Sequence, residues 1–323
     1  APAADGIEDE DLIEREDMVV TVTMQGYIKR TALDSFRSQA RGGKGRAGMA
    51  TKDEDAVTEL FVTSTHTPVL FFSTLGKVYR MKVWRLPEGG PATRGRPMIN
   101  LLPLAEGETI RTVLPLPEDE ESWKDLHVMF ATAKGSVRRN SMDAFTNIPS
   151  NGKIAMKFEG EDADDRLIGV ALLTEGDDVL LASRQGKAIR FMGTDIREFQ
   201  SRASTGVRGM TLKAGDEVIS LSILHRSGAT AEEREAYLRF APWKAEKEGE
   251  PDLSAERFAE MAEKEQFILT ICANGYGKLD VDKPEQVTPN SLFYCASISK
   301  AFTACAIGLL ADEGKLNFDD PVR

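Results

Sequence analysis

The sequence predicts an all-β protein in which small blades form a propeller-like array, because one unit recurs along its 323 residues. In each copy an apolar strand ends in small residues and a glycine turn, and in the first four copies a second strand carries an arginine four residues after that glycine. The turn glycines are Gly26, Gly76, Gly135, Gly186 and Gly275, and the steps between them are 50, 59, 51 and 89 residues. A period near 50 residues with several short strands is typical of propeller blades, which must stack because each is too small to bury its own apolar face.

Each unit has two halves. The first strands are predicted at Met18–Met24, Val69–Thr74, His127–Thr132, Val179–Ser183 and Phe267–Ala273, and the fifth copy stops matching after Lys278. In the second half a glycine-containing stretch leads to a methionine, and an apolar strand follows; these methionines are Met49, Met98, Met156 and Met210.

The repeats divide the chain into segments. We predict an acidic linker at 1–17 and a blade array at 18–278, with blades at about 18–66, 67–126, 127–178 and 179–226 and a partial one at 267–278. The long last step is explained by a helical insertion at 227–266, where Thr230 and Glu233 fit a capping box and Ser254–Gln266 is a second helix. We interpret the insertion as surface decoration, with a partner-binding hairpin as the alternative.

The net charge of −11 argues against nucleic-acid binding until it is divided by region. Residues 1–17 carry −7, residues 227–266 carry −5 and residues 279–323 carry −3, so the rest of the chain carries +4. The repeat body is therefore mildly basic, and the acidic residues gather in its appendages.

The remaining composition indicates a soluble cytosolic protein. Three cysteines without paired spacing favour a reducing compartment. No Cys/His spacing fits a metal site, and no apolar run has the roughly 20 residues of a membrane span. The N-terminus has no signal-peptide pattern.

One loop of the first unit has the chemistry of an anion site. It reads Gln39-Ala40-Arg41-Gly42-Gly43-Lys44-Gly45, with Arg46 next. Its glycines allow close backbone approach, and Arg41 and Lys44 supply charge for phosphate. An ordinary solvated turn is the alternative reading of such a loop taken alone.

The residues from Val20 to Arg30, followed by Arg41 to Gly45, resemble the first blade of the DNA gyrase A C-terminal domain. The later stretches Phe72–Tyr79 and Thr205–Met210 resemble its later blades, and the likeness covers about 18–278. The resemblance implies a six-bladed β-pinwheel whose blades exchange strands and whose basic rim wraps duplex DNA. It also implies that the seven-residue box supports that wrap and separates gyrase from topoisomerase IV.

The resemblance further implies partners and a setting. These are duplex DNA, the N-terminal core of gyrase A and the gyrase B protein, in the cytoplasm and nucleoid of a bacterium, where the assembled topoisomerase introduces negative supercoils. We expect no cofactor in this chain, because ATP and Mg²⁺ are used elsewhere in that enzyme.

Wrapping without base readout needs phosphate contacts spread over a convex surface. Stacked blades would space the arginines four residues after each turn glycine around the rim, with further bases nearby. The predicted DNA contacts are the box residues, Arg46, and the rim bases Lys29, Arg30, Lys77, Arg80, Arg138, Arg139, Lys187 and Arg190. The alternative is that these bases are ordinary exposed residues that close the blade hairpins.

Two departures from the family pattern stand out. Ala40 replaces a residue that is usually basic in the box. The fifth blade is interrupted after Lys278 and no sixth follows, so the sequence predicts an incomplete pinwheel. The strand-passage core with its tyrosine is also missing, and we expect no complete topoisomerase site in this chain.

The segment 279–323 has another pattern. Residues 291–304 resemble the nucleophile helix of serine β-lactamase-like hydrolases, with Ser297 and Lys300 as the S-x-x-K pair. We expect a mixed or helical fragment that is inert without the rest of such an enzyme. The alternative function, from a different class, is a serine hydrolase with Ser297 as nucleophile and Lys300 as its base partner. A third hypothesis is a propeller scaffold for protein partners.

Overall fold

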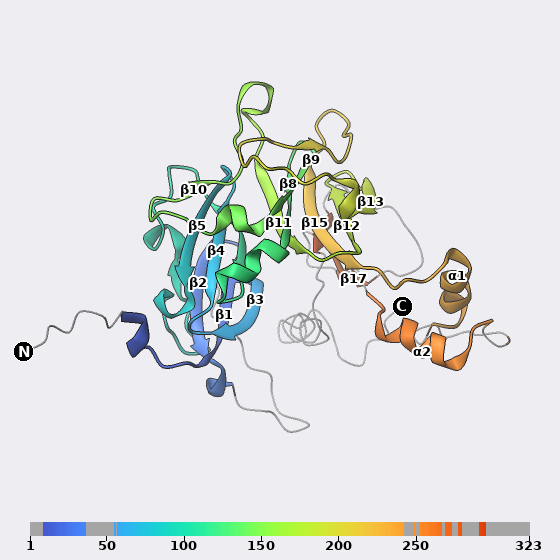
Figure 1. Ribbon diagram of the computed structural model, residues 1–323, viewed down its shortest axis with the longest axis horizontal. Helices are drawn as coiled ribbons and strands as arrows, with labels where there is room; N and C mark the ends of the chain where they lie inside the picture. The colour runs from blue at the N-terminus through green and yellow to red at the C-terminus, as the bar shows by residue number, and fades with distance from the viewer. Residues whose placement is uncertain are drawn as a thin grey trace, which may run out of the picture.

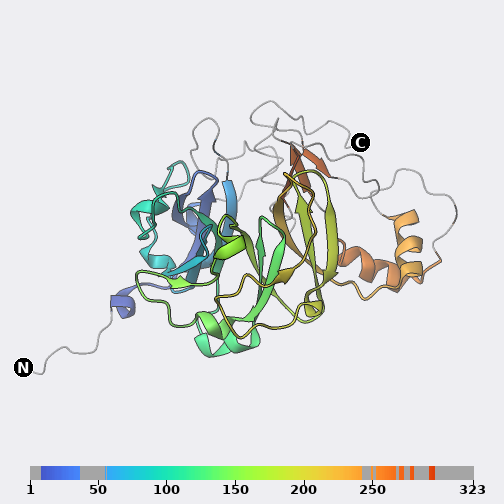
Figure 2. The same cartoon turned by 90° about the horizontal axis from the view of Figure 1, so that it is seen from above.

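The computed structural model describes residues 9–36, 55, 57–241, 249 and 252–266, together with the backbone of three short strands at 269–272, 277–279 and 291–294. Four small antiparallel sheets lie in a propeller-like ring, and α-helix occurs only in two short elements of this described part. In Figures 1 and 2 the sheets follow one another in chain order, from the N-terminal end toward the two helices. The predicted propeller-like fold is confirmed.

The sheets have a common strand order. Blade 1 contains β3 (Val57–Ser64), β1 (Asp17–Thr23), β2 (Tyr27–Ala32) and β6 (Arg96–Pro97). Blade 2 contains β7 (Ile110–Pro115), β4 (Pro68–Ser73), β5 (Lys77–Lys82) and β10 (Lys153–Ile154). Blade 3 contains β11 (Leu167–Leu173), β8 (His127–Thr132), β9 (Ser136–Ser141) and β14 (Val207–Arg208). Blade 4 contains β15 (Val218–His225), β12 (Asp177–Ser183) and β13 (Ala188–Met192).

The repeated Ser/Thr-x-x-Gly sequence forms the same tight hairpin in every blade. In blade 1 the N–H of Gly26 donates to the carbonyl of Thr23 at 2.9 Å, and the next N–H, of Tyr27, donates to the Thr23 hydroxyl at 3.2 Å. The glycine has φ +80°, which a side chain would oppose. Ser73, Thr132 and Ser183 make the same pair of bonds in the other blades. One hydroxyl residue thus closes each turn and fixes its register.

The outer strand of each complete sheet comes from the next unit along the chain. β6, β10 and β14 pair with the second strand of the preceding blade. The N–H groups of Met98, Met156 and Met210 donate to the carbonyls of Gly26, Gly76 and Gly135, and all three side chains are buried. Blades are therefore joined by their backbones as well as by their side chains. We call residues 89–105, 144–158 and 199–215, which carry these strands, the exchange segments.

The hydrophobic core consists of layers between successive blades. Between blades 2 and 3 the rings of Phe72, Phe130 and Phe145 lie 5.6–6.0 Å apart, beside the fully buried Trp123. Similar clusters lie between blades 1 and 2 and between blades 3 and 4. Each blade therefore depends on its neighbour for burial of its apolar face.

The insertion forms a helical hairpin beside blade 4, on the side away from the N-terminus (Figure 1). Helix α1 (Ala231–Phe240) starts with the predicted capping box of Thr230 and Glu233, which is confirmed. Helix α2 (Ala255–Glu263) is capped by Ser254 and packs on α1 through Tyr237 and Phe258, whose rings are 4.8 Å apart. Neither helix of the described part is long and apolar enough to cross a membrane.

A short fifth sheet follows the helices. Its central strand β16 (Leu269–Cys272) pairs with β17 (Gly277–Leu279) on one side and with β18 (Ser291–Tyr294) on the other. The last of these strands belongs to the segment that the sequence separates from the blade repeats.

Candidate nucleic-acid interface

The predicted first-blade box lies outside the described residues. This applies to Gln39, Arg41, Gly42, Gly43, Lys44, Gly45 and the neighbouring Arg46, and also to Ser297 and Lys300. The structure places the remaining predicted bases, and their surroundings divide them into three groups.

The arginines four residues after each turn glycine occupy equivalent positions, but acidic residues surround them. Arg30 pairs with Glu88 at 2.8 Å and donates through Nε to the carbonyl of Leu86 at 3.0 Å. Arg80 pairs with Glu120, and Arg190 pairs with Asp178 at 2.8 Å. The fourth, Arg139, forms a backbone bridge with Glu198, the counterpart of the bridge from Arg30 to Glu88. Much of this charge is therefore neutralised within the blades.

The bases three residues after the turn glycine were expected on the exposed rim, and the structure corrects this placement. Lys29 and Arg138 are both fully buried. Lys29 Nζ donates to the carbonyls of Gly90 and Pro91 at 2.8 and 2.9 Å, and Arg138 Nη1 donates to the carbonyl of Arg202 at 2.7 Å. Both cations donate to backbone carbonyls of the incoming exchange segment and so tie that segment to the blade before it.

Burial also shifts the titration of these two groups. It lowers the pKa of Lys29 to about 8. Burial and the nearby charge of Arg202 lower the pKa of Arg138 to about 10. Because neither cation is exposed, both are excluded from the surface that a large polyanion could touch.

The bases directly after two of the turn glycines lie closer to solvent. Lys187 is exposed, and its ammonium donates to the carbonyl of Thr211. Lys77 is partly exposed and has no ion pair with any described residue. Both remain candidates for contact with phosphate.

A further set of bases lies on the exchange segments. Residues 89–105, 144–158 and 199–215 contain no Asp or Glu, and their bases are Arg94, Arg96, Lys153, Lys157, Arg202, Arg208 and Lys213. Arg96 and Arg208 are exposed and have no ion pair within the described part of the chain. Arg94 is held over the ring of Tyr27, 3.7 Å from its centroid.

Two further cations lie where the exchange segments 144–158 and 199–215 touch. Lys153 Nζ donates to the carbonyl of Ala144 at 3.0 Å, and Arg202 Nη1 donates to the carbonyl of Ile154 at 2.8 Å. Burial and the charge of Arg202 lower the pKa of Lys153. The two cations thus lie close enough for the charge of Arg202 to disfavour the protonated form of Lys153.

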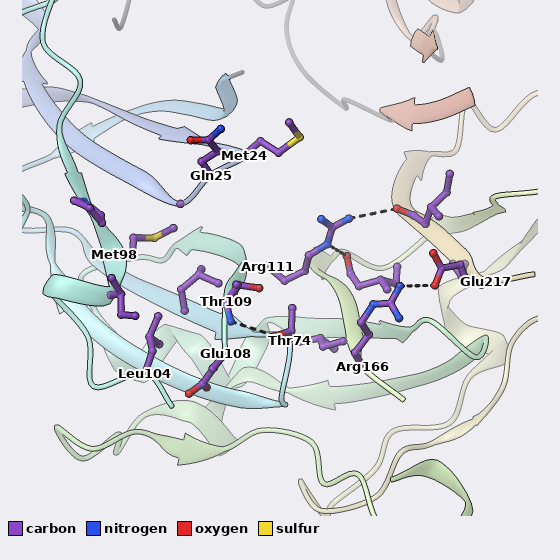
Figure 3. Close-up of a pocket in the computed structure, with 18 of the residues that line it drawn as sticks. Met24, Gln25, Thr74, Met98, Leu104, Glu108, Thr109, Arg111, Arg166 and Glu217 are labelled. Carbon is purple, nitrogen blue, oxygen red and sulfur yellow. Dashed lines mark hydrogen bonds and ion pairs between the residues drawn. The ribbon is translucent and has the colours of Figure 1, made fainter. Parts of the chain in front are cut away.

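At the opposite edge of the sheets, a cavity of about 550 Å³ is bordered by residues of all four blades (Figure 3). Arg111 reaches across two blade boundaries, since its Nε donates to the carbonyl of Ile168 at 2.7 Å and its Nη2 to that of Ile219 at 3.4 Å. Arg166 of blade 3 and Arg184 of blade 4 both pair with Glu217. These guanidinium groups join neighbouring blades, and their charge is shared with protein acceptors.

Side-chain contacts at this inner edge repeat from blade to blade. The carboxylate of Glu59 accepts from the N–H of Val113 at 3.2 Å, and the hydroxyl of Thr112 accepts from the N–H of Val170 at 3.2 Å. Burial raises the pKa of Glu59 to about 8, against the opposing effects of the Val113 hydrogen bond and the charge of Arg111. No group of three or more His, Cys, Asp or Glu residues that could hold a metal ion occurs in the described part.

The repeat geometry agrees with comparison to known proteins. The sequence model of the family described as "DNA gyrase C-terminal domain, beta-propeller" matches residues 17–64, 67–117, 126–173 and 177–225, one match for each blade. The chain belongs to the DNA gyrase A C-terminal domain family.

Relatives of the gyrase family share this part at high identity. The DNA gyrase A protein of Rickettsia bellii is 50% identical over 280 residues, which is 83% of this chain and 30% of the relative. The DNA gyrase A protein of Escherichia coli is 43% identical over 220 residues, 68% of this chain and 24% of the relative. The chain thus spans less than a third of the length of these gyrase proteins.

Solved structures support the same fold. The crystal structure of the C-terminal domain of DNA topoisomerase IV aligns with a TM-score of 0.56 at 22% identity, covering 83% of this chain and 68% of that one. A DNA gyrase A C-terminal domain aligns with a TM-score of 0.53 at 22% identity, covering 82% and 71%. At this identity the comparison supports the architecture alone.

A second family, described as "Beta-lactamase", matches residues 270–323. This match overlaps the strands of the fifth sheet, whereas the gyrase match ends at residue 225. The hydrolase resemblance of the tail is therefore limited to a small piece of that family.

The residues that sequence reasoning missed are the bases of the exchange segments, such as Arg96, Arg202 and Arg208. Their signal was available, because each unit has one long stretch without acids. Residues 35–52, which contain the seven-residue box, are the acid-free stretch of the first unit. In this gyrase family member the box thus occupies the sequence position that the exchange segments hold in later units.

Proposed function

We propose that this chain binds duplex DNA along the outer edges of its blades and bends it, as the DNA-wrapping part of a gyrase A protein. The observation that carries the proposal is the repeated cationic edge: an acid-free exchange segment with exposed bases lies at the same edge of three successive sheets. A DNA duplex that follows this edge meets cations from one blade after another.

The physical basis is release of counterions. Each phosphate neutralised by a fixed cation releases condensed counterions, which favours binding at low salt without reading the base sequence. Because bases occur on three successive exchange segments, contacts at both ends of a duplex segment would offset the cost of bending it. Net acidity of the whole chain does not oppose this, since the acids are concentrated in the appendages.

The first-unit box fits the same proposal. Arg41, Lys44 and Arg46 lie within the acid-free stretch of unit 1 and would extend the cationic edge at its start. In the finer proposal, the wrap presents DNA to the N-terminal core of gyrase A and to gyrase B, and the assembly then supercoils DNA with ATP and Mg²⁺ bound elsewhere. A bacterial cytoplasmic setting near the nucleoid follows from that role.

The test is DNA binding across a salt series with a charge-matched control. We would replace Arg96→Gln and Arg208→Gln together, because both side chains are exposed and unpaired within the described part. If each contacts one phosphate, the slope of log K against log salt should become shallower by about 1.8. The control pair Arg234→Gln and Arg239→Gln makes the same charge change on helix α1 and should leave the slope unchanged.

Trapped writhe in a relaxed circle after ligation then separates wrapping from simple binding. Equal slopes for the parent chain and the Arg96/Arg208 variant would refute the proposed edge. Absence of DNA binding at low salt would refute the DNA function itself and favour a scaffold for protein partners.

A further inference from the structure

The four arginines that follow the turn glycines by four residues are not equivalent in their contacts. Arg30, Arg80 and Arg190 each pair with a carboxylate. The guanidinium of Arg139 in blade 3 has no hydrogen bond or ion pair with any described residue, and its Nε is buried without an acceptor. In blade 1 the corresponding Nε donates to the carbonyl of Leu86 at 3.0 Å. Blade 3 therefore contains an arginine whose charge is not neutralised by the described part of the chain.

The carboxylate expected to pair with Arg139 is that of Glu198. These two residues form the same parallel backbone bridge as their counterparts in blade 1, which do pair. Both oxygens of Glu198 are engaged elsewhere: Oε2 lies 2.9 Å from His127 Nε2, and Oε1 accepts from Gln200 Nε2 at 3.3 Å. An acid thus lies next to Arg139 in the fold without being its partner.

The strand register explains why His127 competes for this carboxylate. His127 lies opposite Ser141, two residues after Arg139 on β9, so the histidine and the arginine share one face of the sheet. The residues eight places before the turn glycines of blades 1, 2 and 4 are Met18, Pro68 and Asp178. None of these three side chains donates a hydrogen bond to a carboxylate when Asp is ionised. Among the four blades, blade 3 alone has a donor at this position.

We propose that Arg139 binds a phosphate group of duplex DNA, and that His127 keeps it available by holding Glu198. This role rests on the proposed DNA function and singles out one of four equivalent arginines. Arg139 is partly exposed, and a guanidinium without a carboxylate partner is suited to phosphate, which it can bind through two parallel N–H donors. His127 acts through Glu198, so it is a positioning residue.

The other three arginines are less suited to this role for a physical reason. A phosphate that approached Arg30 or Arg190 would have to displace a carboxylate already paired at 2.8 Å, or share the guanidinium with it. Two anions on one cation repel each other. At Arg139 no exchange is needed, because Glu198 keeps its bonds to His127 and Gln200.

The first test is arginine side-chain NMR of the full chain, titrated with inorganic phosphate at constant ionic strength. The Nε–H signal of Arg139 should shift and saturate, whereas the signals of Arg30 and Arg190 should stay in place. This measurement uses no DNA, so it tests the site separately from the proposed function. An unmoved Arg139 signal, or equal shifts of all three signals, would overturn the proposal.

Three variants in the same titration test the positioning role of His127. His127→Ala releases Glu198, which should then pair with Arg139 as Glu88 pairs with Arg30, and the response to phosphate should be lost. His127→Gln keeps an amide donor for Glu198 and should retain the response. Adding Glu198→Gln to His127→Ala removes the competing carboxylate and should restore it. The same response in all three variants would overturn the positioning role.

The second test is DNA binding across a salt series. Arg139→Gln should make the slope of log K against log salt shallower by about 0.9, the share of one phosphate. Its Tm should equal that of the parent chain, because the guanidinium has no partner in the described part. Arg234→Gln on helix α1 makes the same charge change and should keep the parent slope.

The outcomes separate this inference from the proposed function. If the parent chain binds DNA and Arg139→Gln has the same slope, the role of Arg139 is refuted and the DNA function stands. If the parent chain binds no DNA at low salt while Arg139 responds to inorganic phosphate, the proposed function is refuted, and DNA as the source of the phosphate with it.

Discussion

The buried guanidinium of Arg138 offers a sharp test of how the blades are held together. We would replace Arg138→Met, which keeps an apolar side chain in place of the buried cation. In the structure Arg138 donates to the carbonyls of Arg202, Ser204 and Ala155, and its Nε donates to Asn140 Oδ1 at 2.6 Å. The substitution leaves these acceptors without their donor, inside the joint between a blade and its exchange segment.

The expected loss follows from the number of orphaned acceptors. Each buried polar group left unsatisfied costs about 1–3 kcal/mol. Removal of the buried charge offsets part of this, because the desolvation that lowers the pKa of Arg138 disappears with it. We expect a net loss of about 4 kcal/mol in the free energy of unfolding. For an array of this size that lowers Tm by roughly 8–16 °C.

Two variants make the assay specific. Arg138→Lys should lose only about half as much free energy of unfolding as Arg138→Met, because Lys29 donates to two carbonyls at the equivalent position of blade 1. Arg208→Met, at an exposed position, should change it by less than about 0.5 kcal/mol. Thermal unfolding gives the total effect, and amide hydrogen exchange in residues 199–215 locates it. If Arg138→Met changed neither Tm nor hydrogen exchange, the hydrogen bonds of Arg138 would not hold the exchange segment in place, and this reasoning would be refuted.

Two more predictions concern the exchange strands and the inner edge. Gly206→Ala should destabilise the chain by at least ~2 kcal/mol, because Gly206 has φ +98° and its Cβ would lie 2.1 Å from the carbonyl oxygen of Val137. Gly90→Ala, where the added atom meets nothing within 4 Å, is the matched control, and equal melting of the two would contradict the account. Burial raises the pKa of Glu59 to about 8, so the folded state holds a proton that the unfolded state has lost. The contribution of Glu59 to the free energy of unfolding is fully present below about pH 4.5 and is lost as pH rises through 8. Because the side chain is partly exposed, we expect this contribution to be about 2 kcal/mol. Glu59→Gln should therefore flatten the pH dependence of unfolding between pH 4.5 and 8, whereas identical profiles would argue against a protonated Glu59.

The hairpins were predictable because their information is local. The pattern Ser/Thr-x-x-Gly determines each turn through one hydroxyl and one glycine, and the first strands lie within two residues of their predicted starts in the four blades. The capping box at Thr230 was equally local. The chemical role of the bases was harder to predict. Lys29 and Arg30 are neighbours on one strand, and successive side chains point to opposite faces.

Which of those faces is covered depends on a segment some 60 residues later in the chain. The carbonyls of Gly90 and Pro91 cover Lys29, and Glu88 approaches Arg30. Strand alternation therefore predicts that two adjacent bases differ in environment, but not which one is buried. The same holds for Arg138, two of whose carbonyl partners come from the exchange segment of unit 4.

The sequence by itself determined the number of blade units, their hairpins, the helical insertion and the separation of a basic repeat body from acidic appendages. It also contained the acid-free stretches that mark the cationic edge. Only the tertiary structure decided that units 2, 3 and 4 each give a short strand to the blade before them, and that Lys29 and Arg138 are buried inside those joints. It also decided that β13 lacks such a strand within the described residues. The physical reason is that backbone donors and acceptors carry no sequence label, so their partners are fixed only when distant segments pack together.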